Sequence, residues 1–240
     1  GTEPLAAITF DDGYRDNADT AMPILRELGA TATFFVTTGP LETGRGLWIS
    51  ELWRLVPRLP AGPLGVDRGA PMTVPADVDA RGPLRRELTR RLAPLTIQER
   101  EGALDRLALT AGVARGEGLE DSFCRPLDLR RLHDAGMTVG AHTRGHPHLE
   151  RLTTVFHDEE VLGSREDLED LLEAPVRHFA YPNPGGTGRF PPPVRDAVAR
   201  AGFVSAVTSS PAPLGPGCDT LRLPRLGVYA GPQERLLFGL

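Results

Sequence analysis

The sequence contains no lysine, and all 27 of its basic residues are arginines. Acidic residues outnumber them at 32, which gives a formal net charge of -5 at pH 7 and an isoelectric point near 5.7. Proteins that bind nucleic acid or anionic lipid usually carry a strongly basic face. The charge balance therefore argues against nucleic acid as a partner, and we attribute the use of arginine alone to compositional bias.

Cysteine is scarce, since Cys124 and Cys218 are the only two. They could form at most one disulfide, so the chain is neither a disulfide framework nor a cysteine-rich zinc site. No segment approaches the ~18 consecutive apolar residues of a transmembrane helix, and no signal peptide is evident. Because residues 8–10 are expected to lie in the core although they are so close to Gly1, an upstream signal or anchor that has been removed stays open. The compartment, cytoplasmic or extracytoplasmic, stays open too.

Apolar runs and amphipathic segments alternate along most of the chain. Residues 5–10 and 31–37 are expected to be buried strands, and residues 18–28 between them have helical spacing. The alternation returns later, with helices expected over 127–135, 156–172 and 196–201 and strands over 138–141, 176–180, 203–208 and 226–229. This pattern favours one α/β domain over 1–240, built on a parallel sheet or barrel whose chemistry lies at the carboxyl ends of the strands.

The alternation breaks between about residues 48 and 122. A helix is expected near 48–59, followed by a proline- and glycine-rich stretch over 60–83 and then by two more helices. The second of these opens with Thr96 and, three residues later, Glu99, which is the pattern of a capping box. We interpret 48–122 as an inserted helical subdomain or lid, and call it the insert.

Two pairs of polar residues stand directly after expected strands. His142 and His146 are four residues apart, so both rings can reach one metal ion if the backbone makes a helical turn, although such pairs are more often surface or core residues. Asp11 and Asp12 are adjacent, and neighbouring carboxylates repel each other unless a cation or a shared proton relieves them. A turn or helix cap explains one aspartate better than two. A metal centre explains both, with one carboxylate as ligand and the other as base.

Several segments resemble, in order and spacing, the motifs of the polysaccharide deacetylases with a NodB homology domain, also called carbohydrate esterase family 4. Residues 9–13 (TFDDG) are similar to the first motif, and residues 142–146 (HTRGH) to its His-(Ser/Thr)-x-x-His motif. Residues 178–183 (HFAYPN) are similar to a Phe-Ala-Tyr-Pro variant of the third motif, and 223–225 (LPR) extend the match. The resemblance covers nearly the whole chain.

This resemblance implies a distorted (β/α) barrel, often seven-stranded, that carries zinc or another divalent ion. Asp11 would be the catalytic base, and the metal ligands would be Asp12, His142 and His146. Asn183 stands where the family commonly offers a backbone N–H to the oxyanion. Zn2+ is the expected ion, but this ligand set also suits Co2+, Ni2+, Fe2+ or Mn2+. Three protein ligands leave coordination positions for water and substrate, as a catalytic site requires.

The sequence departs from the family pattern in two places. The general acid of the family is usually a late histidine, but no histidine follows His178, so the acid is unidentified. The arginine that often orients the base in the third motif is replaced by Ala180. Our hypothesis is that Arg225, or less favourably Arg222, pairs with Asp11 from a neighbouring strand end. The alternative is a surface arginine.

Aromatic side chains can form platforms for pyranose rings. Tyr181 and Pro182, in the third motif, and Trp48, which opens the insert, are the expected substrate contacts. Trp53 is a further aromatic candidate. Core packing is the commoner role of a tryptophan on a helix and is the alternative.

The expected function is metal-dependent removal of an N-acetyl group from an acetamido sugar, in a polysaccharide or a smaller glycoside. Acetylated carbohydrate is the expected partner, and the oligomeric state is left open. One alternative is hydrolysis of O-acetyl esters or non-sugar amides on the same fold. Another is an inactive member that binds glycan, against which the presence of Asp11 argues, because a base is not needed merely to hold metal.

Overall fold

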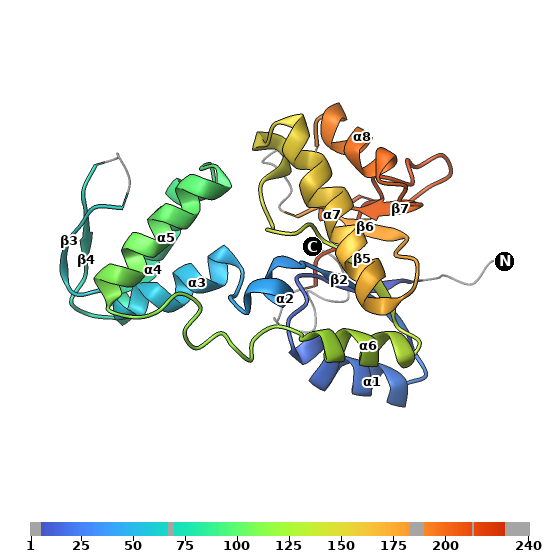
Figure 1. The fold of residues 1–240 in the computed structure, drawn as a ribbon, viewed down its shortest axis with the longest axis horizontal. Coiled ribbons are helices and arrows are strands. Elements are labelled where there is room, and N and C mark those ends of the chain that lie inside the picture. Colours follow the sequence, from blue (N-terminus) through green and yellow to red (C-terminus); the bar gives the residue numbers. More distant parts are fainter. Residues whose placement is uncertain (1–5, 67–69, 183–189, 213, 229–240) are drawn as a thin grey trace.

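The computed structural model describes residues 6–66, 70–182, 190–212 and 214–228. We call the part of the protein outside the insert the body. Its five parallel strands form one curled sheet, in the order β1-β2-β5-β6-β7 (Figure 1). These strands are β1 (Ile8–Phe10), β2 (Ala32–Val36), β5 (Thr138–Ala141), β6 (His178–Ala180) and β7 (Ser205–Val207). The predicted α/β fold with a barrel-like parallel sheet is confirmed, with five strands rather than seven in the part of the chain that is described.

Helices connect the strands of the body. A π-helical turn (Asn17–Ala21) leads into α1 (Met22–Glu27), and α2 (Gly39–Thr43) follows β2; α6 (Pro126–Asp134), α7 (Thr154–Leu172) and α8 (Pro192–Arg200) come later. Phe34 on β2 and Phe179 on β6 are completely buried, in the same core as Leu129 of α6 and Val194 of α8. Each fully buried side chain of this size stabilises the fold by roughly 1.5–3 kcal/mol. None of the described helices is long and apolar enough to span a bilayer.

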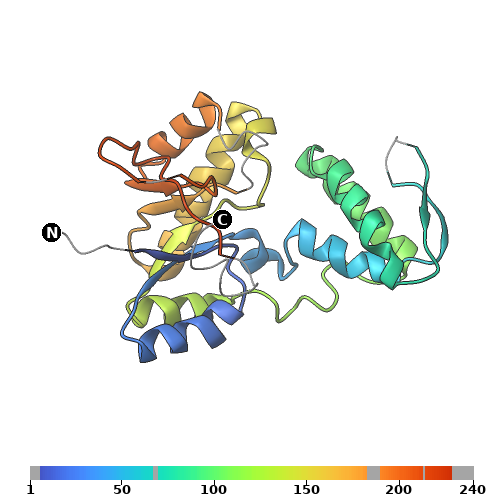
Figure 2. The same ribbon diagram turned by 180° about the vertical axis from the view of Figure 1, so that it is seen from behind.

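The insert has a hydrophobic core of its own and lies beside the body (Figures 1 and 2). Its elements are α3 (Trp48–Leu55), β3 (Gly62–Leu64), β4 (Met72–Val74), α4 (Gly82–Leu92) and α5 (Ile97–Ala111), with 3-10 turns at Val56–Arg58 and Asp79–Arg81. The predicted capping box of α5 is present. The hairpin of β3 and β4 was not predicted, because proline and glycine are depleted in strands.

The strand expected over 226–229 is wrong for residues 226–228, which have no strand pairing, and residue 229 lies outside the described residues. Instead, Leu223 forms a single parallel bridge with Val207 of β7. Pro224 follows and cannot donate a backbone hydrogen bond to extend the pairing. Leu226 and Val228 are 67% and 76% exposed, so this apolar pattern does not face a core.

Candidate metal centre

Asp12, His142 and His146 come together at the carboxyl ends of the parallel strands. The Nε2 atom of His142 lies 3.4 Å from Oδ1 of Asp12, and that of His146 lies 3.3 Å from the same oxygen. Ligands at zinc bond lengths in a tetrahedral site are roughly 3.3 Å apart. One donor atom from each of the three residues lies within 4.8 Å of the other two. The three side chains could therefore hold one divalent ion.

The backbone at these ligands adopts a conformation that few residues other than glycine accept. The φ angles are 74° at Asp12, 67° at Thr143 and 51° at His146. Each such residue costs on the order of 1–3 kcal/mol and persists only where surrounding contacts enforce it. Gly13 continues the first turn with φ 79°, and a Cβ there would lie 2.9 Å from Cγ1 of Val36. Contacts with the rest of the protein therefore hold a strained backbone that directs the side chains of Asp12 and His146 toward each other.

A backbone hydrogen bond orients the buried ring of His142. Its Nδ1 lies 2.7 Å from the carbonyl oxygen of Ala180, at the end of β6. If Nδ1 carries the proton and donates it to this carbonyl, Nε2 presents its lone pair toward Asp12, as second-shell partners of metal-binding histidines commonly arrange. Ala180, which replaces the arginine of the family motif, thus contributes through its main chain.

The three candidate ligands perturb one another electrostatically. Burial acts to raise the pKa of Asp12, but hydrogen bonds from the imidazoles and their charge outweigh it and leave the pKa well below the usual range. Burial acts to lower the pKa of His142, yet Asp11 and Asp12 raise it overall. The pKa of His146 is lowered, mainly by burial. Asp12 is therefore an anion whose charge a cation at this site would compensate.

Asp11 is held from the opposite side by Arg225. The Nη1 and Nη2 atoms of Arg225 each lie 2.7 Å from one carboxylate oxygen of Asp11. Nη1 also donates to Oγ1 of Thr9, at 2.9 Å, and Nε donates to the carbonyl of Thr208, at 3.1 Å. Arg225 thus joins β1 to the segment after β7, the two edges of the sheet. The expected pairing with Asp11 is present, while the catalytic roles of both residues stay predictions.

The expected substrate contacts lie mostly in cores. Trp48 is 7% exposed in the core of the insert, with the guanidinium of Arg100 4.9 Å from its ring. Tyr181 is 1% exposed, and its hydroxyl donates to the carbonyl of Leu221 at 2.9 Å. Pro182 is also buried, and Asn183 lies outside the described residues. A platform role for Trp48 or Tyr181 stays a prediction that this burial does not favour.

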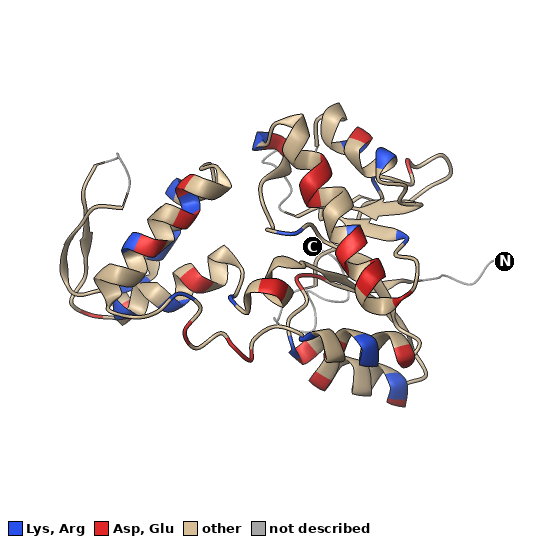
Figure 3. Cartoon of the chain, in the orientation of Figure 1, with Lys and Arg blue, Asp and Glu red and all other residues tan. Residues whose placement is uncertain are grey.

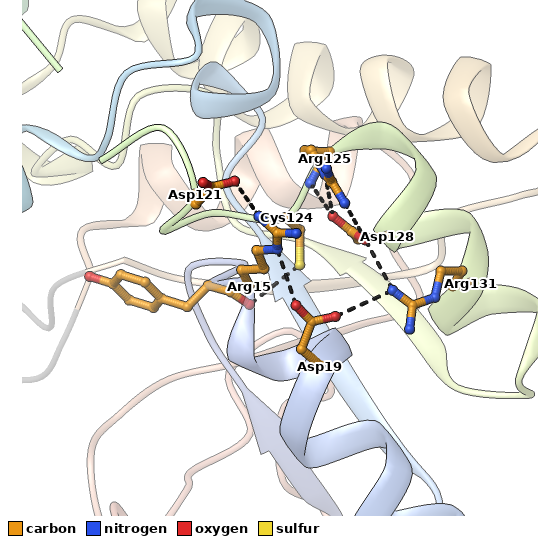
Figure 4. Close-up of polar contacts among 8 residues, drawn as sticks. Arg15, Asp19, Asp121, Cys124, Arg125, Asp128 and Arg131 are labelled. Atoms are coloured by element: carbon orange, nitrogen blue, oxygen red, sulfur yellow. Dashed lines mark hydrogen bonds and ion pairs between the residues drawn. The ribbon is translucent and has the colours of Figure 1, made fainter. Parts of the chain in front are cut away.

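The turn after the aspartates is bonded to the chain as it returns from the insert. The amide of Arg15 donates to the carbonyl of Ser122 at 3.0 Å, and that of Cys124 donates to the carbonyl of Gly13 at 2.9 Å. The guanidinium of Arg15 also pairs with Asp121 (Figure 4). These contacts place the end of the insert directly against the loop that carries Asp12.

Further polar contacts surround the same turn. Tyr14 makes a 3.1 Å hydrogen bond through its hydroxyl to Ser50 of α3. The thiol of Cys124 donates to the carbonyl of Tyr14 at 3.3 Å (Figure 4). Burial raises the pKa of Cys124 to about 12, so this thiol stays protonated and is not a nucleophile. Both ends of the insert therefore contact the turn.

Two acidic residues of α7 contact the His142–His146 loop and were not predicted from the sequence. Oε2 of Glu160 accepts a hydrogen bond from the amide of Gly145 at 2.7 Å. Asp167 forms a two-point ion pair with Arg144, at 2.8 and 2.6 Å. The available signal was helical spacing, which places Glu160 on the same face as the buried residues His157 and Ser164.

Comparison with known proteins agrees with this geometry. Residues 1–77 and 85–206 match the polysaccharide deacetylase family. The comparison with curated proteins found no match.

Solved structures of deacetylases share the fold. Deacetylase PplD of Streptococcus pyogenes, in complex with acetate, has a TM-score of 0.57 at 18% identity over 93% of this chain and 64% of that chain. IcaB from Ammonifex degensii has a TM-score of 0.57 at 17% identity, over 100% and 73% of the two chains. The BpsB deacetylase domain from Bordetella bronchiseptica has a TM-score of 0.52 at 14% identity, over 92% and 72%. This chain thus spans less than two thirds of the streptococcal one.

Identities this low show the fold alone, whereas the family match extends over most of the sequence. With the aspartate pair and the histidine pair of that family gathered at one end of the sheet, the chain belongs to the polysaccharide deacetylase family.

Proposed function

We propose that this protein is a hydrolase that uses a divalent metal ion to remove the acetyl group from the nitrogen of an acetamido sugar. The observation that carries the proposal is that two adjacent aspartates contact different partners. Asp12 lies 3.3–3.4 Å from two imidazole nitrogens, whereas Asp11 faces Arg225 instead. These contacts support metal binding as the proposed role of Asp12 and proton transfer as the proposed role of Asp11.

A metal ion held by Asp12, His142 and His146 would polarise the acetyl carbonyl and lower the pKa of a bound water. Zn2+ is the ion we propose, and Co2+, Ni2+, Fe2+ or Mn2+ would also suit the ligand set. The burial of His142, whose side chain is 2% exposed, fixes one ligand, and its hydrogen bond to Ala180 fixes the ring orientation.

Asp11 would take the proton from the attacking water. Its side chain is 31% exposed, so water can reach it. Arg225 occupies one position on each carboxylate oxygen, and each oxygen has a second lone pair that can accept a proton or a hydrogen bond. The ion pair therefore orients Asp11 without blocking it. The backbone N–H of Asn183 is proposed to stabilise the oxyanion.

The leaving group separates the two main candidate reactions. No histidine follows His178 in the 240 residues of this sequence, so the acid that would protonate a departing amine is unidentified. An alcohol leaves more readily than an amine and needs less help from an acid. Hydrolysis of an O-acetyl ester on a sugar is therefore the second candidate function.

Acetate release from a matched panel of N-acetyl and O-acetyl sugars tests both candidates. We expect release that disappears after treatment with a chelator and returns when Zn2+ is added, because Asp12 and the two histidines bind the ion. Comparison of the N-acetyl and O-acetyl members assigns the bond. Release that survives complete metal removal would contradict the metal-dependent mechanism. A metal-loaded protein that releases no acetate would favour a glycan-binding function.

Replacing Arg225 by alanine should lower kcat by about 100-fold, since misplacing a catalytic group by ~1 Å can have an effect of this size. KM and metal content should change little, because Arg225 contacts Asp11 rather than the metal ligands. Steady-state kinetics with metal analysis provide the measurement. Arg222→Ala is the matched control, because Arg222 donates to the carbonyl of Phe190 instead. Equal turnover in Arg225→Ala and the wild type would refute the positioning role.

A further inference from the structure

Glu160 is a buried carboxylate on a helix whose acidic residues are otherwise largely at the surface. Acidic positions are spread along α7 (Figure 3), and Asp158 and Glu159 just before Glu160 are exposed. Glu160 is only 5% exposed. Removing a carboxylate from water costs free energy unless hydrogen bonds compensate it. The contacts of Glu160 must therefore offset the cost of its burial.

The contacts of Glu160 are made to the main chain between the two candidate metal-binding histidines. Its Oε2 accepts the amide of Gly145 at 2.7 Å. Burial raises the pKa of Glu160, and hydrogen bonds from the amides of Gly145 and Arg144 partly oppose this effect. A Cβ at residue 145 would lie 3.0 Å from Oε1 of Glu160. Glycine at this position lets the carboxylate approach closely.

The same loop is held on its other side by the segment that follows β2. The amide of Thr38 donates to the carbonyl of Thr143 at 3.1 Å, and the amide of Gly39 donates to that of Arg144 at 2.8 Å. Two carbonyls of the loop, those of Thr143 and Arg144, are thus bound by residues 38–39, and the Gly145 amide is bound by Glu160. Since Thr143 and His146 both have positive φ, these opposed contacts can enforce the unfavourable backbone.

We propose that Glu160 is a positioning residue of the metal centre, whose carboxylate holds the Gly145 amide and so sets the separation of the His142 and His146 rings. The inference rests on the metal site of the proposed function, but not on its substrate. His142 is anchored by β5 and by Ala180. His146 directly follows Gly145, whose amide Glu160 binds, so releasing Glu160 should displace His146.

Metal binding by Glu160 variants tests this role without any substrate. Chelator-treated wild type, Glu160→Ala, Glu160→Asp and Glu160→Gln would be titrated with Zn2+ by calorimetry and with Co2+ by visible absorption. We expect Glu160→Ala to lose about 10–100-fold in affinity, as is typical when outer-shell support of a metal ligand is removed, and to show an altered Co2+ spectrum. Glu160→Gln, which retains a carbonyl acceptor, should partly restore both.

Glu159→Gln is the matched control, because Glu159 is the exposed neighbour on the same helix. It should bind both ions as the wild type does. Wild-type affinity and spectrum in Glu160→Ala would overturn the proposal, even if thermal stability fell. If Glu160→Ala does not fold, Glu160→Asp decides, because its shortened side chain should still weaken binding. A metal-loaded protein that releases no acetate would count against the proposed function, not against this one.

Discussion

Replacement of Asp11 by asparagine is expected to reduce acetate release by about 10²- to 10⁴-fold, the usual contribution of a general base. Asparagine keeps the shape of the side chain but cannot take a proton from water. The metal should remain bound, because the candidate ligand atoms belong to Asp12, His142 and His146. Measurement of kcat together with metal content separates loss of the base from loss of the ion.

Asp16→Asn is a suitable control for Asp11→Asn. Asp16 lies five residues further along the chain and is exposed, so its replacement should leave turnover unchanged. Thermal unfolding should accompany the kinetics, since Asp11→Asn leaves the guanidinium of Arg225 without its carboxylate partner. Full turnover of Asp11→Asn at equal metal occupancy would show that another group is the base.

Replacement of His142 by alanine is expected to weaken metal binding by more than the ~100-fold that loss of an outer-shell partner can produce. Its Nε2 is one of three candidate ligand atoms, and its Nδ1 lies 2.7 Å from the carbonyl oxygen of Ala180, which orients the ring. Acetate release should fall with metal occupancy and recover in part at high Zn2+ concentration. Calorimetric titration of chelator-treated protein measures the effect.

His148→Ala controls for the loss of a nearby imidazole. His148 follows the candidate ligand His146 by two residues, but its Nδ1 lies 3.2 Å from Oε1 of Glu150, outside the Asp12 cluster. Its removal should leave metal affinity unchanged. Because His142 is buried, circular dichroism must show that His142→Ala still folds. A folded His142→Ala protein with wild-type affinity would exclude His142 as a ligand.

The parts of the site that could be predicted from sequence are those contained in short segments. Asp11 and Asp12 directly follow one strand, and His142 directly follows another. Parallel strands bring their carboxyl ends to the same edge of a sheet, so alternation of apolar runs and helices was enough to expect these residues to meet. The α/β fold followed from the same alternation, although the irregular last segment led to a wrong strand.

Residues that act across the fold were harder to predict. Arg225 and Asp11 are 214 positions apart, and their pairing was a hypothesis that depended on how the last segment closes against β1. Trp48 has the same sequence character whether it forms a platform or packs in a core. Its burial against the other helices of the insert depends on how α3 packs with α4 and α5.

The sequence by itself indicated the chemistry of the candidate site, because the proposed ligand Asp12 and the proposed base Asp11 are adjacent on the chain and the two histidines are four residues apart. Tertiary structure decided how that chemistry is held in place. Arg225 reaches Asp11 from the segment after β7, Ala180 orients His142 through its carbonyl, and Glu160 binds the Gly145 amide. These contacts involve main-chain atoms or distant segments, which leave no local pattern in a sequence.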